Sequence, residues 1–260
     1  MSVVVGYRLI AANLERNLAV TANQGPVRNE SDYYLANRGS VRSLDDFLAD
    51  TRLFRFAMTA FGLEDLAFAR GYMRKVLEGG VSDPRSLANR TTDVRIREFA
   101  RAFDFATFGD LTMSRAVTGQ AVVDRHVRQT LEVEAGARDG EGVRLALYFQ
   151  RQAATIDDAF DILGDAALSQ VVRTALGLPE AIAGVDIDRQ AEILNERLDY
   201  ADFRDPVALD RFLTRFASLW DARNDAVPDP VLALFGGGPS GPAVSIELAM
   251  SLSTLRLGGR

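Results

Sequence analysis

Hydrophobic residues recur with the period of an α-helix through most of the chain. Leu53, Phe56, Ala57, Ala60 and Phe61, for example, lie three or four positions apart and form one apolar stripe. No segment alternates apolar and polar residues for long enough to predict a strand. We expect helices over 5–18, 53–61, 66–77, 96–103 and 115–135, and a further helix over 143–152 after a break at the glycine-bearing segment 136–142. The pattern predicts an all-α fold.

One helical unit occurs twice in the sequence. Segment 49–65 aligns with segment 164–180 with six identities, where about one is expected from ordinary residue frequencies. The matched residues are Asp50, Leu53, Thr59, Ala60, Gly62 and Leu63, and Asp165, Leu168, Thr174, Ala175, Gly177 and Leu178. We therefore predict a helical bundle with an internal pseudo-two-fold duplication, joined by a long central helix. The alternative is the general similarity of amphipathic helices.

Matching helix-start and helix-end signals favour duplication over that alternative. Ser43–Asp46 and Thr155–Asp158 each have the residue pattern of a capping box, offset by three residues between the copies. Asp83-Pro84 and Asp205-Pro206 each place a capping aspartate before a proline at the first helical position. Gly62 and Gly177 are expected to end their helices in the left-handed conformation.

These signals divide the chain into six parts. We expect N-terminal helices over 1–42, the first repeat over 43–108, a central helix and hairpin over 109–154 and the second repeat over 155–220. Residues 221–242 hold four of the eight prolines and a glycine run, which is typical of a linker. Residues 243–260 form an apolar C-terminal segment, and its interaction candidates are Ile246, Leu248, Met250, Leu252, Leu255 and Leu257.

Charge and composition exclude several classes of protein. The net charge is −6, with 36 acidic and 30 basic residues, which gives nucleic-acid binding no electrostatic support. The chain has no cysteine, so disulfides, thiol catalysis and thiolate metal sites are excluded. The N-terminus lacks the pattern of a cleaved signal peptide, and no apolar run is long enough to span a bilayer. We expect a soluble, cytoplasmic protein.

No residue cluster specifies a reaction. Gly236–Gly241 matches the G-x-G-x-x-G pattern, but only 19 residues follow it, too few for a dinucleotide-binding unit, so a linker is expected. His126 is the only histidine and is interpreted as structural or surface-exposed. Asp157, Asp161 and Asp165 are spaced to share a helix face, yet capping of helix starts explains them better than a cation site does.

The aromatic residues also have a structural interpretation, because they fall at helical spacing and are expected in the core. They are Phe99, Phe103, Phe105, Phe108, Phe212, Phe216 and Trp220. We therefore predict no catalytic, cofactor-binding or metal-binding residue and no cofactor.

Three long blocks resemble one known family. They are NRGSVRSLDDFLADTRLFRFAMTAFGLEDLAFARGYMRKVLEGG, VRQTLEVEAGARDGEGVRLALYFQRQAATIDDAFDIL and DIDRQAEILNERLDYADFRDP. The chain resembles the alphaproteobacterial domain-of-unknown-function family numbered 1217 from about Tyr7 to Trp220 and again at its LRLGGR end. The resemblance implies an all-helical, uncharacterised protein, encoded beside flagellar genes, with no catalytic residue to carry over.

Two functions follow from these observations. The first is a non-enzymatic structural, adaptor or assembly protein of the flagellum, which binds a protein partner and is associated with the basal body without a cleaved signal. The alternative is a carboxylate-based hydrolase or a small-ligand-binding protein, which requires two acids in one cleft.

Overall fold

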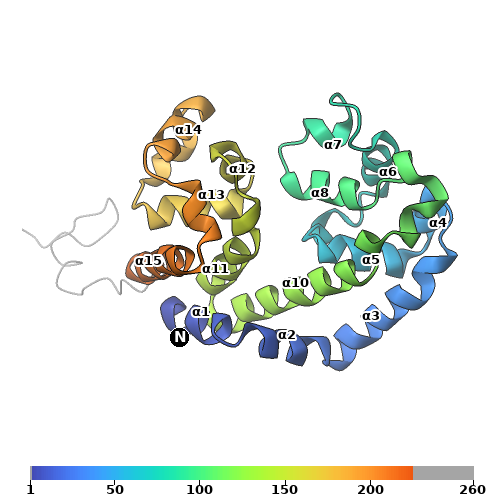
Figure 1. Ribbon diagram of the computed structural model, residues 1–260, viewed down its shortest axis with the longest axis horizontal. Coiled ribbons are helices and arrows are strands. Elements are labelled where there is room, and N and C mark those ends of the chain that lie inside the picture. Colours follow the sequence, from blue (N-terminus) through green and yellow to red (C-terminus); the bar gives the residue numbers. More distant parts are fainter. Residues whose placement is uncertain (1, 225–260) are drawn as a thin grey trace, which may run out of the picture. The chain divides into compact units, whose positions relative to one another are not determined.

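The computed structural model describes residues 2–224 (Figure 1). Within that range every regular element is an α-helix or a short 3₁₀ helix, which confirms the all-α prediction. The α-helices are α1 (Val3–Ala11), α2 (Leu14–Ala22), α3 (Gly25–Asn37), α4 (Leu44–Ala49), α5 (Thr51–Ala60), α6 (Arg70–Gly79), α7 (Leu87–Arg90), α8 (Val94–Ala102), α9 (Phe105–Phe108), α10 (Gln120–Asp139), α11 (Glu141–Gln152), α12 (Ala159–Leu163), α13 (Ala166–Ala175), α14 (Ile187–Asn195) and α15 (Pro206–Asn224).

The compact unit Met1–Trp220 contains two hydrophobic clusters. The first cluster is formed by α3 to α9 and includes Tyr34, Phe47, Phe54 and Phe99, with several of its rings in direct contact. The second cluster is formed by α1 and α11 to α15, and its fully buried members include Phe149, Val171, Val172, Leu213 and Phe216. The aromatic residues expected in the core lie in these clusters, except that Phe108 is partly exposed under the guanidinium of Arg115.

Helix α10 belongs to both clusters. Its N-terminal half contributes Val122, Val123 and Val127 to the first cluster. Its C-terminal half contributes Leu131 and Ala135 to the second. It packs against α2, α5 and α11 and so runs from one cluster to the other (Figure 1). This is the long central helix that the sequence predicts.

The two segments matched in sequence have the same local contacts. Asp50 and Asp165 each accept hydrogen bonds from the second and third residues of the helix that they start. The second carboxylate oxygen of each aspartate accepts a hydrogen bond from the hydroxyl of Tyr33 or Tyr148, each 17 residues upstream.

The helix ends agree as well. Gly62 and Gly177 have φ values of 68° and 67°, as predicted for a left-handed helix end. In each of these matched pairs, the residue of the second segment lies 115 positions after its counterpart in the first segment. Duplication of the whole units 43–108 and 155–220 stays a prediction.

Two of the predicted caps are wrong. Ser43 and Asp46 form a full capping box, but Thr155 donates to the carbonyl of Gln152, and Asp158 is the residue that caps α12. No three-residue offset is therefore needed, because Asp158 lies 115 residues after Ser43. Asp205 caps α15 as predicted. Asp83, in contrast, accepts from the backbone of Arg85 within a turn, and α7 begins later, after Ser86.

Four predicted helix boundaries also differ. The opening helix is interrupted at Ala12 and Asn13, so α1 and α2 are separate. The central helix begins at Gln120, after a 3₁₀ turn in which the hydroxyl of Thr118 donates to the carbonyls of Thr112 and Arg115. The break expected at 136–142 is confined to Gly140, which has a φ of 107°. The expected helix over 66–77 is a 3₁₀ turn followed by α6, which Gly80 caps at its C-terminus.

Candidate functional site

A groove lies between the two hydrophobic clusters. It consists of two adjoining cavities of about 420 and 280 Å³ that share Asp165, and we call it the inter-cluster groove. Residues of α8 line one side, residues of α12 and α13 line the other, and α11 contributes to both cavities. The walls meet at Gly164, where a Cβ atom would lie 3.3 Å from a methyl group of Val94. A larger residue at 164 would push the walls apart.

Most carboxylates of the groove are already bound. Asp157 forms an ion pair with Arg204. Glu98 forms one with Arg125 at 3.3 Å. Asp161 accepts from the backbone nitrogen of Asp157 at 3.0 Å. These carboxylates therefore have structural roles.

The other two acids of the groove are bound in the same way. Asp93 is paired with Arg95 at 2.8 Å, and Asp165 caps α13 and accepts from Tyr148. Within residues 2–224 no group of three or more acids or histidines could hold a metal ion. The interpretation of Asp157, Asp161 and Asp165 as helix-start residues is supported for two of them. Asp165 caps α13, and Asp161 accepts from the backbone just before α12.

Two arginines of the groove have no such partner. Arg97 and Arg101 lie one turn apart on α8 and line the smaller cavity. Neither forms an ion pair or a side-chain hydrogen bond with another described residue, and Arg101 is exposed. Guanidinium groups bind carboxylates with two parallel hydrogen bonds, so this pair can bind acidic groups.

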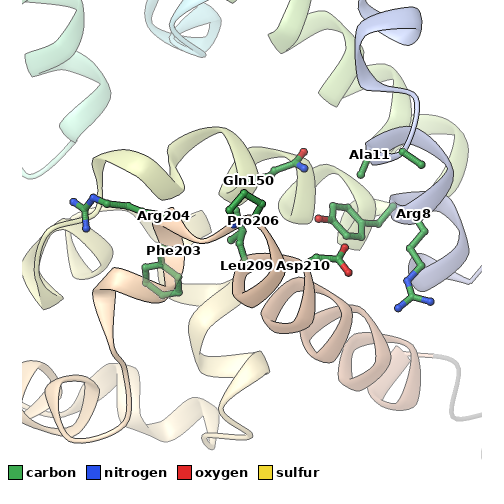
Figure 2. Close-up of a pocket in the computed structure, with 10 residues that line it drawn as sticks. Arg8, Ala11, Gln150, Phe203, Arg204, Pro206, Leu209 and Asp210 are labelled. Atoms are coloured by element: carbon green, nitrogen blue, oxygen red, sulfur yellow. The ribbon is translucent and has the colours of Figure 1, made fainter.

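A second cavity, of about 490 Å³, lies between α1, α11, the 3₁₀ turn Tyr200–Arg204 and α15, and we call it the Tyr7 cavity (Figure 2). Its polar lining residues are Tyr7, Arg8, Gln150, Arg204 and Asp210. Its apolar lining residues are Ala11, Ala12, Phe203, Pro206 and Leu209. It therefore combines an apolar wall with a few polar groups, the usual composition of a small-molecule site.

A buried ion network lies between these two sites. Glu132 of α10 is 1% exposed and accepts hydrogen bonds from Arg128 at 2.8 Å and from Arg151 at 2.9 Å. Arg128 also donates to Gln150 in the Tyr7 cavity, and Arg151 donates to Gln129 in the groove. This network was not predicted from the sequence, although Arg128 and Glu132 have the four-residue spacing of a helical ion pair.

His126 is buried against the ring of Phe56, with ring centroids 4.1 Å apart. Its Nδ1 atom has no hydrogen-bond partner. Burial lowers the pKa of this imidazole to about 4, so the ring is neutral near pH 7. The side chain belongs to the helix packing between α5 and α10, which agrees with a structural interpretation.

Several predicted features lie outside the described residues. They are the Gly236–Gly241 motif and the interaction candidates Ile246, Leu248, Met250, Leu252, Leu255 and Leu257. Within the described range, no helix is long and apolar enough to cross a membrane.

The comparisons with known proteins place the chain in a family of helical proteins. The family model for the protein of unknown function DUF1217 matches residues 60–209. The crystal structure of a protein from Agrobacterium tumefaciens, a structural-genomics target, is similar with a TM-score of 0.79 and 41% sequence identity. The match covers 85% of this chain and 93% of that one. No curated protein matches. The chain belongs to the DUF1217 family.

Proposed function

We propose that this chain is a non-enzymatic adaptor or assembly protein that holds a segment of a protein partner in the inter-cluster groove. The observation that supports this most directly is the contrast within the groove. Its acids are engaged in caps and ion pairs, whereas Arg97 and Arg101 have no partner among the described residues. A partner segment that carries carboxylates can form ion pairs with these two arginines.

The walls of the groove favour a peptide segment over a small molecule. The lining includes polar groups, such as Gln170 and Thr155, and apolar ones, such as Leu145 and Leu168. A groove of mixed lining can contact both the side chains and the backbone of a peptide. Arginines are also among the residues that commonly dominate the free energy of protein–protein binding.

We further propose that the partner is a component of the flagellum. Family membership supports this, because the resemblance to DUF1217 implies genes encoded beside flagellar genes. The apolar segment with Ile246, Leu248 and Met250 is a second proposed contact. Removal of the chain after Pro230 is expected to weaken partner binding.

A genetic test addresses the proposal. Deletion of the gene in a flagellated host is expected to reduce swimming in soft agar, and the natural gene is expected to restore it. A gene with Arg97→Glu and Arg101→Glu is expected to fail, because reversed charges repel the acids of the partner. The matched control is Arg211→Glu with Arg215→Glu, which reverses two arginines at the same spacing on α15, outside the groove.

Two results would contradict the proposal. Normal swimming of the deletion strain would remove the flagellar assignment. Full rescue by the folded Arg97→Glu, Arg101→Glu variant would remove the groove as the binding surface. Circular dichroism of the purified variants checks whether both pairs of substitutions leave the helical fold intact.

The alternative function, a carboxylate-based hydrolase, has less support. Asp93 and Asp165 line the same cavity, but one is held by Arg95 and the other caps α13. A general acid requires a carboxyl group in an environment that favours its protonated form. Both carboxylates are instead engaged by structural contacts.

A further inference from the structure

The Tyr7 hydroxyl lines the cavity without a protein partner. The Tyr7 side chain is 1% exposed, and its hydroxyl forms no hydrogen bond with another described residue. Among the described side chains only His126 has a fully buried polar atom without a partner, so the Tyr7 hydroxyl is accessible from the cavity. A polar ligand that enters the cavity can therefore form a hydrogen bond with it.

Asp210 gives this hydroxyl a negative neighbour. It is the one carboxylate among the residues that line the cavity, and it forms neither an ion pair nor a side-chain hydrogen bond with another described residue. Burial, and then the charge of Asp210, raise the pKa of Tyr7 to about 12. The hydroxyl stays protonated, and the carboxylate is close enough for its charge to act there.

The two arginines of the cavity are directed elsewhere. Arg204 forms an ion pair with Asp157 of the groove. Arg8 donates to Thr214 at 3.3 Å, and Figure 2 shows its guanidinium pointing away from Gln150. The carboxylate of Asp210 is therefore available to a cationic group.

Gln150 adds a fixed donor to the cavity. Its amide oxygen accepts from Arg128 at 3.2 Å, and because a guanidinium only donates, this contact identifies the oxygen. The amide nitrogen forms no hydrogen bond with another described residue. It is therefore free to donate to a ligand oxygen, while the opposite wall offers Phe203, Pro206 and Leu209 to an apolar group.

We propose that the Tyr7 cavity binds an α-ammonium group together with its neighbouring carbonyl oxygen. The ammonium group lies between Asp210 and the Tyr7 hydroxyl, and the carbonyl oxygen accepts from Gln150. An apolar side chain covers Leu209 and Phe203. Two sources present this chemistry, a free amino acid and the N-terminal residue of a partner chain. The site is separate from the groove and does not depend on the proposed function.

Titration calorimetry of the full chain with three probes tests this proposal. The probes are L-leucine, which models the free amino acid, L-leucinamide, which models a chain N-terminus, and N-acetyl-L-leucinamide, which lacks the ammonium group. The ammonium-bearing probes are expected to bind, and the acetylated probe is expected to bind at least tenfold more weakly. Asp210→Asn and Tyr7→Phe are each expected to weaken binding of the ammonium-bearing probes at least fivefold, while Asp110→Asn, an exposed acid on another element, leaves it unchanged.

The outcomes separate the sources and can overturn the site. Tighter binding of leucine than of leucinamide supports a free amino acid, and binding of leucinamide that is equal or tighter supports a chain N-terminus. Absence of binding by both at 10 mM would overturn the proposal. So would equal binding of the acetylated probe, or undiminished binding by folded Asp210→Asn protein.

Discussion

Single residues show how burial determines chemistry in this protein. His126 is neutral because its ring is buried against Phe56, and Glu132 lies at 1% exposure between two arginines that bind it. Neither environment is visible in the sequence, where both residues lie on an amphipathic helix. The caps at Ser43, Asp165 and Asp205, in contrast, were predictable, because a cap depends only on residues two or three positions away.

The burial of His126 predicts a pH dependence of stability. Its pKa is about 4 in the folded chain against 6.5 for the free side chain. As the pH falls, the imidazole is therefore protonated in the unfolded chain before it is protonated in the folded one. The free energy of unfolding is expected to fall by about 3 kcal/mol in total between about pH 6.5 and about pH 4. Urea unfolding of the natural chain and His126→Leu at pH 7, 5.5 and 4.5 measures it.

The difference in free energy of unfolding between these two proteins reports on His126 alone, because they share all their other titratable groups and the chain has no second histidine. The natural chain is expected to lose more stability than His126→Leu over this range. Parallel curves for the two proteins would show that the imidazole is solvated in the folded state.

At the scale of elements, the matching starts and ends of α5 and α13 were predicted correctly, whereas several other helix boundaries were not. Both helices start at a capping aspartate and end at a glycine with positive φ, as their sequences indicate. The separation of α1 from α2 and the late start of α10 depend on hydrogen bonds within turns, such as those of Thr118. Periodicity of apolar residues does not reveal such bonds.

Glycine substitutions test the helix ends. Gly177→Ala is expected to lower the free energy of unfolding by about 1 kcal/mol, because φ is 67° and no neighbouring atom lies within 4 Å of an added Cβ. The cost is therefore conformational alone. Gly184→Ala is the control, because it also has open space but no positive φ, and it is expected to leave stability nearly unchanged. Equal stabilities of the two variants in urea unfolding would refute the left-handed end.

At the scale of the unit Met1–Trp220, the division into two hydrophobic clusters was not predicted. The repeat predicted two helical units, but the groove between the clusters depends on contacts such as that of Gly164 with Val94, which join positions far apart in the sequence. Asp157, Asp161 and Asp165 were singled out from spacing alone, whereas Arg97, Arg101, Tyr7 and Asp210 were missed. Only the fold shows that their side chains lack partners.

The sharing of α10 predicts that the two clusters unfold together. Phe99→Ala in the first cluster and Phe216→Ala in the second each remove a fully buried ring and are expected to cost about 3–5 kcal/mol. Because α10 packs in both clusters, each variant is expected to lower hydrogen-exchange protection along the whole of α10. Protection lost only at 122–127 in one variant and only at 131–135 in the other would show independent clusters.

The network around Glu132 has a consequence for regulation. Gln150 in the Tyr7 cavity and Gln129 in the groove are held by two arginines that share one carboxylate. A ligand that displaces Gln150 alters the hydrogen bonds available to Arg128, and through Glu132 those of Arg151. Thermodynamic linkage is reciprocal. If a ligand in the cavity changes the affinity of the groove for its partner by some factor, the partner changes the affinity of the cavity for its ligand by the same factor. Occupation of the proposed cavity site would then change the affinity of the proposed groove for its partner segment.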